Sequence, residues 1–300
     1  MARERYEYFE PRRMASLANL SILARQAVEG FISGLHRSPH RGFSVEFSEH
    51  REYSPGDDLR HLDWVAWGRS DRFYIKQYEQ ETNLRAHILL DVSGSMGYRH
   101  GGTCSKFIYG CFLSACLSYL MARQQDAVGM IAFDRDVRFQ LPPASTPSHL
   151  DRLFKQLETL EPGQETAIAP TFHSLADRIA KRSLVIVISD LYDEPDEIVR
   201  ALQHFVYKKH QIMVFHLMDP AELDFPFKKI HTFVDMETGE KIQVDPRTVK
   251  DAYQAEVASF IERYRKECSD RNIEYRLVTT DTPYDRMLLD YLARRKRMVR

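Results

Sequence analysis

Short apolar runs alternate with amphipathic stretches along the chain from about residue 84 onward. Residues 86–90 and 183–188 are apolar at nearly every position, which is typical of strands that are buried on both faces of a sheet. Between such runs, apolar residues recur three and four positions apart, as in residues 147–160, which predicts helices with one buried side. The alternation predicts a doubly wound, mostly parallel α/β sheet flanked by helices, with right-handed crossovers.

One segment interrupts this alternation. Residues 219–246 contain two short apolar stretches, 230–234 and 241–244, separated by the turn sequence Glu237-Thr238-Gly239, so we expect a β-hairpin there. The other predicted strands are residues 86–90, 127–133, 137–141, 183–188, 211–217 and 273–279, and the predicted helices are residues 104–123, 147–160, 168–182, 194–209, 247–271 and 284–297.

The first 82 residues have a different pattern. Residues 13–35 carry leucine, alanine and phenylalanine at helical spacing, and residues 43–47 alternate apolar and polar side chains, which predicts a helix followed by a strand with one buried face. A second short strand is expected near residues 73–75. We therefore expect a helix with a small β subdomain over residues 1–82 and a larger α/β domain over residues 83–300.

Composition narrows the class of protein. Of 300 residues, 28% are charged and 43% hydrophobic, with a formal net charge of -1, which argues against a protein that coats nucleic acid through bulk charge. No run approaches the roughly 20 apolar residues that span a bilayer. The N-terminus also lacks the apolar core of a signal peptide. We expect a cytoplasmic protein without a membrane span, in which the four cysteines serve as core residues.

Polar side chains gather where two predicted strands end. Asp91 ends the first apolar strand and is followed by Ser93 and Ser95, while Asp190 ends the strand at residues 183–188. In a doubly wound sheet, ligands bind at the carboxyl ends of the strands. Carboxylate and hydroxyl oxygens are hard ligands that suit Mg²⁺ or Mn²⁺ better than Zn²⁺, and Gly94 permits a tight loop. Taken alone, the two serines fit helix capping and turn formation equally well.

The pattern Asp91-x-Ser93-x-Ser95 resembles the metal-ion-dependent adhesion site of von Willebrand factor A domains, which have a Rossmann-like sheet. In that family a later loop supplies a threonine and the fourth strand an aspartate, and Thr166 and Asp190 stand at these places. The resemblance implies an ion, Mg²⁺ or otherwise Mn²⁺ or Ca²⁺, with one coordination position open for a carboxylate of a partner protein. Glu165 departs from the usual glycine, so its carboxylate either lies near the ion or points to solvent.

A second signature precedes this domain. It consists of Gly34-x-His36-x-Ser38, Gly42-Phe43-Ser44-Val45-Glu46-Phe47, Arg51-Glu52-Tyr53-Ser54-Pro55-Gly56-Asp57-Asp58-x-Arg60-x-x-Asp63-Trp64, Gly68-Arg69 and Glu79. With the A-type domain it resembles the family called domain of unknown function 58, over about residues 14–290. Members are bacterial or archaeal and commonly encoded beside MoxR-type AAA+ ATPases. This chain resembles the short type without two N-terminal membrane helices. The region between Arg51 and Asp63 is either a structural brace of Arg–Asp pairs or a binding site.

These features favour a metal-dependent protein-interaction module that works with a MoxR-type AAA+ ATPase on client proteins, with no catalytic residues. One alternative is a Mg²⁺-dependent phosphohydrolase, but the second acid that such a site needs is Ser93 here. The sequence also has no glycine-rich phosphate loop with a lysine. Another alternative is a scaffold in which the ion only stabilises the fold.

Overall fold

The structure is a computed structural model that describes residues 19–37, 50–52, 67, 73–76, 84–163 and 167–298. The chain divides into two compact units, one formed by residues 31–82 and the other by residues 1–30 together with residues 83–300. The larger unit contains the central sheet and all residues of the predicted metal site that the structure describes.

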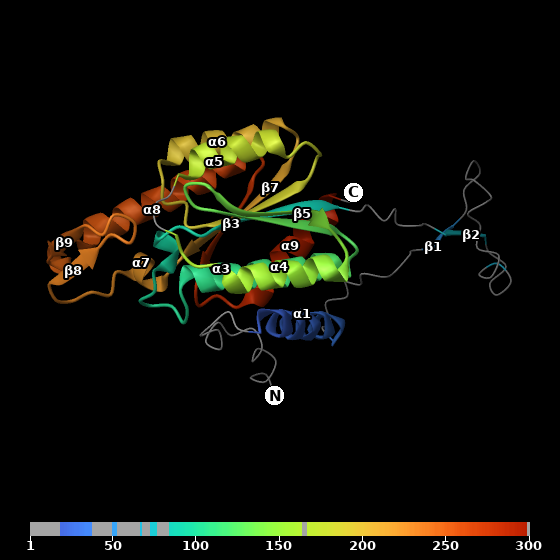
Figure 1. The fold of residues 1–300 in the computed structure, drawn as a ribbon, viewed down its shortest axis with the longest axis horizontal. Helices are drawn as coiled ribbons and strands as arrows, with labels where there is room; N and C mark the ends of the chain where they lie inside the picture. Colours follow the sequence, from blue (N-terminus) through green and yellow to red (C-terminus); the bar gives the residue numbers. More distant parts are fainter. Residues whose placement is uncertain are drawn as a thin grey trace. The chain divides into compact units, whose positions relative to one another are not determined.

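A six-stranded sheet forms the centre of the larger unit (Figure 1). Its strands are β3 (Arg85–Asp91), β4 (Ala127–Phe133), β5 (Val137–Ala144), β6 (Leu184–Ser189), β7 (Gln211–Met218) and β10 (Glu274–Thr279). Their order is β10-β7-β6-β3-β4-β5, in which every neighbouring pair is parallel except β4 and β5. The prediction of a doubly wound, mostly parallel α/β sheet is confirmed.

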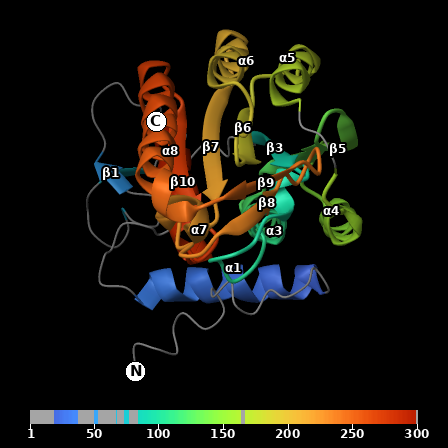
Figure 2. The same ribbon diagram turned by 90° about the vertical axis from the view of Figure 1, so that its left-hand side faces the viewer.

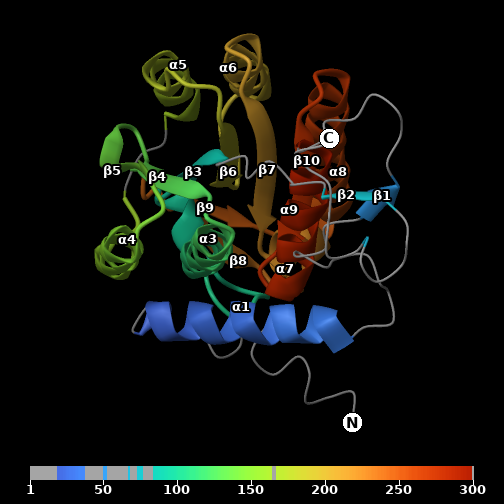
Figure 3. The ribbon, with the colours of Figure 1, turned by 90° about the vertical axis from the view of Figure 1, so that its right-hand side faces the viewer.

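Helices cover both faces of this sheet (Figures 1 and 3). One face carries α5 (Ile168–Arg178), α6 (Pro195–Tyr207) and α8 (Pro246–Asp270), and the other carries α3 (Lys106–Arg123), α4 (Pro147–Thr159) and α9 (Tyr284–Met298).

Successive residues of the strands face opposite helix layers. Leu89 belongs to the core that contains Phe172 of α5 and Phe205 of α6. Its neighbour Leu90 lies against α3 on the other face, where a Cβ added at Gly110 would approach Leu90 to 3.0 Å. Because side chains alternate along a strand, burial on both faces requires the continuous apolar runs seen in the sequence.

The helix α1 spans Leu20–Arg37, and the predicted start of this helix at residue 13 lies outside the described residues. Its first half packs within the larger unit. The backbone N–H of Leu20 donates to Glu158 of α4 at 2.9 Å, and the Tyr119 hydroxyl of α3 donates to Glu29 at 2.9 Å. The structure thus groups residues 20–30 with the sheet.

In the smaller unit, β1 (His50–Glu52) pairs antiparallel with β2 (Tyr74–Lys76). The strand expected near residues 73–75 is therefore confirmed. The rings of Trp67 and Phe73 stack with their centroids 5.8 Å apart. The expected strand at residues 43–47, and most of the charged signature between Arg51 and Asp63, lie outside the described residues.

The expected hairpin is formed by β8 (His231–Val234) and β9 (Lys241–Val244), which follow the short helix α7 (Pro220–Asp224). Figure 2 looks onto the end of the sheet where this hairpin lies, in front of β3 and α3. A Cβ added at Gly97, in the loop after β3, would come within 3.5 Å of the Met236 side chain in the hairpin turn. The hairpin therefore lies beside the loop that carries Ser93 and Ser95. Within the described residues, no helix is long and apolar enough to cross a bilayer.

Candidate metal centre

Asp91 and Asp190 meet at the carboxyl ends of two neighbouring strands. Strands β3 and β6 pair in parallel with Leu90 opposite Ile188, so both chains leave the sheet at the same edge. The two aspartates are 0% and 1% exposed. The structure therefore brings together two buried carboxylates at the edge where doubly wound sheets bind ligands.

Hydrogen bonds from the two loops fix the carboxylate of Asp91. The backbone N–H of Ser93 donates to Oδ1 at 2.9 Å, and the Ser189 hydroxyl donates to Oδ2 at 2.6 Å. Burial, together with the nearby charge of Asp190, raises the pKa of Asp91 to about 7. A cation beside two buried carboxylates that repel each other in this way would favour their charged forms.

The two serines of the loop lie side by side. The Ser93 and Ser95 hydroxyl oxygens are 3.1 Å apart, and Ser93 is fully buried. Ser95 is also the first residue of the short 3₁₀ helix η4 (Ser95–Gly97). The hydroxyls therefore share one small region next to Asp91, as a common ligand would require.

Thr166, the remaining predicted ligand, and Glu165 lie outside the described residues. The structure does describe the residues on either side of this segment. The Gly163 N–H donates to the carbonyl of Val92 at 2.5 Å, and the Ile168 N–H donates to the Asp193 carboxylate at 3.1 Å. Both flanks of the segment 164–166 thus contact the loops that follow Asp91 and Asp190.

A lysine that the sequence reasoning missed lies within this site. Lys106, at the first position of α3, is 1% exposed, and its Nζ lies 2.8 Å from Asp190 Oδ2 and 2.7 Å from Glu222 Oε1. Burial by itself lowers the pKa of Lys106, but the attraction of these two carboxylates outweighs it, so the pKa is raised. The signal in the sequence is that Lys106 is the only Asp, Glu, Lys or Arg between Arg99 and Arg123.

Glu222 belongs to a capping box that sequence reasoning also missed. The Asp219 N–H donates to Glu222 Oε2 at 2.6 Å at the start of α7. The Asp219 carboxylate accepts the backbone N–H groups of His100, Gly101 and Gly102 at 2.7–3.1 Å. The spacing Asp219-x-x-Glu222 after a buried strand is the signature of such a box. The box ties the loop between Ser95 and Lys106 to the end of β7.

The residues present fit a hard divalent cation. No three His, Cys, Asp or Glu side chains of the described chain lie close enough to hold a metal ion by themselves, so a site here depends on Asp91, Asp190 and the hydroxyls. Among the described residues, Asp190 Oδ2 has the Lys106 ammonium as its partner and accepts no hydrogen bond. Two carboxylates, Asp190 and Glu222, contact this one ammonium, and Asp91 with the two hydroxyls adds oxygen donors of the kind that suits Mg²⁺, Mn²⁺ or Ca²⁺.

Comparison with known proteins agrees with the second sequence signature. Residues 49–263 match the family described as "Protein of unknown function DUF58". The chain belongs to this family.

Curated relatives and solved structures give little more. An uncharacterized protein of Mycobacterium tuberculosis is 23% identical over 265 residues, which cover 84% of this chain and 82% of the relative. The conserved hypothetical protein BatB from Bacteroides thetaiotaomicron has a TM-score of 0.48 and 21% identity, over 70% of this chain and 99% of that chain. An aerotolerance-related membrane protein from Bacteroides fragilis has a TM-score of 0.46 and 22% identity, with coverage of 70% and 99%.

Proposed function

We propose that this chain is a metal-dependent protein-interaction module whose ion is held by Asp91, Ser93, Ser95, Thr166 and Asp190. The observation that carries the proposal is the pair of buried carboxylates, Asp91 and Asp190, at adjoining strand ends with two hydroxyls beside them. A hard cation in this place would leave a coordination position for a carboxylate of the partner.

A binding role is favoured over catalysis by the residue types of the loop after Asp91. A phosphohydrolase of this kind needs a general acid beside the attacking carboxylate, and the second acidic position of the loop is Ser93 here. We therefore assign no catalytic residue, and a Mg²⁺-dependent phosphatase activity abolished by Asp91→Asn would overturn this assignment.

A purely structural ion is disfavoured by Lys106. Its ammonium already compensates part of the charge on Asp190 and Glu222 without any metal. The fold therefore has a cation of its own at this place, which leaves the ion available for recognition.

For the partner we propose a MoxR-type AAA+ ATPase or its client, acting in the assembly or remodelling of other proteins in the cytoplasm. This step rests on the family to which the chain belongs and on the resemblance of its loop to an adhesion site. The acidic side chain that completes the ion's coordination would come from that partner.

Two measurements test the proposal one after the other, the first for metal binding and the second for partner binding. Isothermal titration of the chelator-treated full chain with Mg²⁺, Mn²⁺ and Ca²⁺ should show one site that is lost in Asp91→Asn, Ser93→Ala and Thr166→Ala. The matched control is Asp151→Asn, an exposed carboxylate on α4 that should leave the titration unchanged. Circular dichroism confirms that each variant is folded.

Pull-down of a purified MoxR-type ATPase at constant Mg²⁺ then compares the wild type with Asp91→Asn. Because Mg²⁺ is present throughout, nucleotide binding by the ATPase is not disturbed. Equal recovery by both proteins would refute a metal-bridged contact, whereas loss only with Asp91→Asn supports it.

A further inference from the structure

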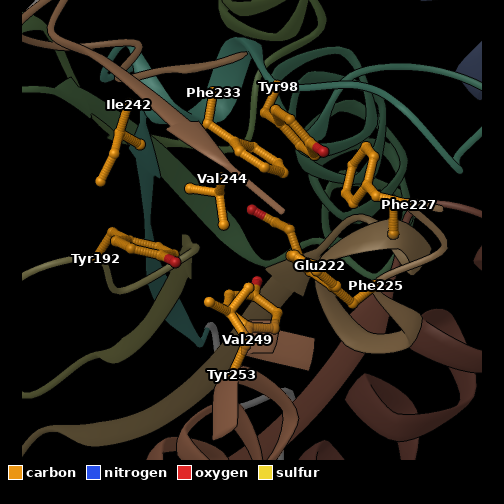
Figure 4. A pocket seen from close by; sticks show the side chains of 11 residues that line it. Tyr98, Tyr192, Glu222, Phe225, Phe227, Phe233, Ile242, Val244, Val249 and Tyr253 are labelled. Carbon is orange, nitrogen blue, oxygen red and sulfur yellow. The ribbon is translucent and has the colours of Figure 1, made fainter. Parts of the chain in front are cut away.

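A pocket of about 380 Å³ opens next to the metal centre. Its walls come from the hairpin β8–β9, from α7 and the turn after it, from α8, and from the two loops that carry the predicted metal ligands. The lining residues are Tyr98, Tyr192, Ala221, Glu222, Phe225, Phe227, Phe233, Ile242, Val244, Val249 and Tyr253. Figure 4 shows Glu222 in the middle of this group, with aromatic side chains around it.

The pocket is continuous with the metal centre. Tyr98 lies three residues after Ser95, and Tyr192 lies two residues after Asp190, so each ligand-bearing loop also supplies a wall of the pocket. Lys106 Nζ bridges Asp190 at 2.8 Å and Glu222 at 2.7 Å. One ammonium therefore connects a lining residue of the pocket, Glu222, with a predicted metal ligand, Asp190.

The chemistry of the lining selects an apolar occupant. Among the residues that the structure describes, Glu222 is the only charged residue of the lining, and both of its oxygens are engaged, Oε1 by Lys106 and Oε2 by the Asp219 N–H. The Lys106 ammonium also lies 5.8 Å and 5.7 Å from the ring centroids of Tyr98 and Tyr192. Since both oxygens of Glu222 are engaged, the rest of the lining offers aromatic and aliphatic surface to an apolar side chain.

The rim of the pocket is unusually apolar for an exposed surface. Ile242 is 63% exposed and Tyr192 is 51% exposed. Phe225, the residue after α7, has a φ of 45°, a left-handed conformation that is costly for a phenylalanine. The chain accepts this local strain at a residue whose ring lines the pocket. Apolar surface of this kind, next to a polar centre, marks interaction sites.

We propose that this pocket takes a large apolar side chain of the same partner segment whose acidic residue completes the metal centre. The inference rests on the proposed function. Lys106 Nζ lies 2.8 Å from Asp190 Oδ2 and 2.7 Å from Oε1 of Glu222, which lines the pocket. Because an extended segment advances about 3.3 Å per residue, an apolar residue one to three positions from the acid reaches the pocket. The partner motif is therefore an aspartate or glutamate with a leucine, isoleucine, methionine or phenylalanine one to three residues away.

Selection from a displayed library of random peptides tests this motif. The immobilised full chain in Mg²⁺ should enrich peptides that pair an acid with a large apolar residue at that spacing. One enriched peptide is then synthesised with a fluorophore, and its affinity is measured by fluorescence polarisation. Changing its apolar residue to alanine should weaken binding roughly tenfold or more, as for a buried anchor.

Matched variants locate the contact. Ile242→Lys on the rim and Val249→Trp, which fills the pocket, should each weaken the peptide roughly tenfold. Ile230→Lys is the control, because Ile230 is 61% exposed but does not line the pocket. Against Val249→Trp, the peptide with alanine in place of its apolar residue should bind almost as well as the original peptide, because the tryptophan already fills the pocket.

The outcomes separate the inference from the proposed function. Enrichment of acidic peptides without an apolar preference, lost in Asp91→Asn, overturns the pocket and leaves the metal site standing. Equal effects of Ile242→Lys and Ile230→Lys, or no enrichment at all, also overturn the pocket. Binding that needs the pocket but survives Asp91→Asn overturns both the two-point motif and the proposed metal bridge.

Discussion

The ammonium nitrogen of Lys106 lies 2.8 Å from Oδ2 of Asp190, and both side chains are 1% exposed. A buried carboxylate without a partner costs several kcal/mol, so this lysine stabilises the site when no ion is bound. A divalent ion at Asp190 would share the carboxylate with Lys106, whose other partner, Glu222, lies 2.7 Å away. Lys106 thus connects the candidate metal site with the aromatic pocket.

Replacing this lysine should make the protein more dependent on metal. Lys106→Met leaves Asp190 and Glu222 without their cation and should lower the free energy of unfolding by about 3–5 kcal/mol in the absence of metal. Mg²⁺ should then raise the melting temperature of Lys106→Met more than that of the wild type, because the ion replaces the lost positive charge. Thermal melts with and without Mg²⁺ measure both effects.

The control for this experiment is Lys181→Met, an exposed lysine that precedes β6, at the opposite end of that strand from Asp190. It should melt like the wild type under both conditions. If Mg²⁺ stabilises Lys106→Met no more than the wild type, the ion does not bind at Asp190.

Asp219 should control the order of the loop between η4 and α3. Its carboxylate accepts the N–H groups of His100, Gly101 and Gly102. Burial raises the pKa of Asp219, but these hydrogen bonds outweigh burial and leave the pKa lowered. Asp219→Asn keeps the size but loses the charge, so we expect about 1–3 kcal/mol lower stability.

Amide hydrogen exchange in residues 98–105 reports the order of the loop between η4 and α3, and it should become faster in Asp219→Asn. Asp224→Asn, at the exposed end of the same short helix, serves as the control. Unchanged exchange in Asp219→Asn would mean that the loop is held by other contacts.

The C-terminal helix should depend on one ion pair. Arg295 of α9 binds the carboxylate of Asp126 through Nε at 2.8 Å and through NH2 at 3.1 Å, and Asp126 is 0% exposed. Arg295→Ala leaves a buried carboxylate without its cation. We expect the free energy of unfolding, measured by urea denaturation, to fall by about 3–5 kcal/mol.

A double mutant separates the stability lost with the Arg295–Asp126 ion pair from the stability lost with the packing of the Arg295 side chain. Adding Asp126→Asn to Arg295→Ala should recover part of the stability, because the buried charge is removed. By contrast, breaking the more exposed pair Arg276–Asp290 should cost no more than about 1 kcal/mol. Equal losses at the two pairs would contradict this ranking.

His87 should make the fold sensitive to acid. Burial, aided by the charges of His210 and Arg85, lowers the pKa of His87 from 6.5 to about 4. Between these values the unfolded chain binds a proton that the folded chain does not, so stability is full above pH 6.5 and falls as the pH drops toward 4. The slope is at most about 1.4 kcal/mol per pH unit from this residue.

Urea denaturation from pH 7 to pH 4.5, roughly the window set by these pKa values, tests the effect. His87→Leu should show a smaller loss of stability over this window than the wild type, while His231→Leu, at an exposed position, should follow the wild type. The buried His216, whose pKa is also lowered to about 4 by burial, should keep part of the acid sensitivity in both variants.

Local patterns predicted most element boundaries, and the differences have local causes. The helix expected at residues 104–123 begins at Lys106, because the Ser105 hydroxyl caps it by accepting the Ile108 N–H. The helix expected at residues 168–182 ends at Arg178, where Ile179 turns to an extended conformation while staying buried. An apolar residue after a helix end still fits the helical period, so periodicity alone extends the helix.

The sequence predicted some residues of the candidate site and not others. Asp91 and Asp190 could be placed from the sequence, since strand ends of a parallel sheet meet at one edge. Lys106 could not, because its partner Glu222 lies 116 residues away and a lysine at a helix start is ordinarily exposed. The pocket depends on where the hairpin packs, which its own turn sequence does not determine.

The sequence by itself therefore determined the layered α/β sheet, the hairpin and the two aspartates at the strand ends. The sheet and the hairpin follow from periodicity and turn residues, which act over short stretches of chain. The position of the aspartates follows from the kind of sheet that this periodicity predicts, because parallel strands end at one edge. Only the tertiary structure decided that Lys106 lies between Asp190 and Glu222 and that the hairpin encloses an aromatic pocket beside them. Such contacts join distant segments, and they depend on how whole helices and loops pack rather than on any local pattern.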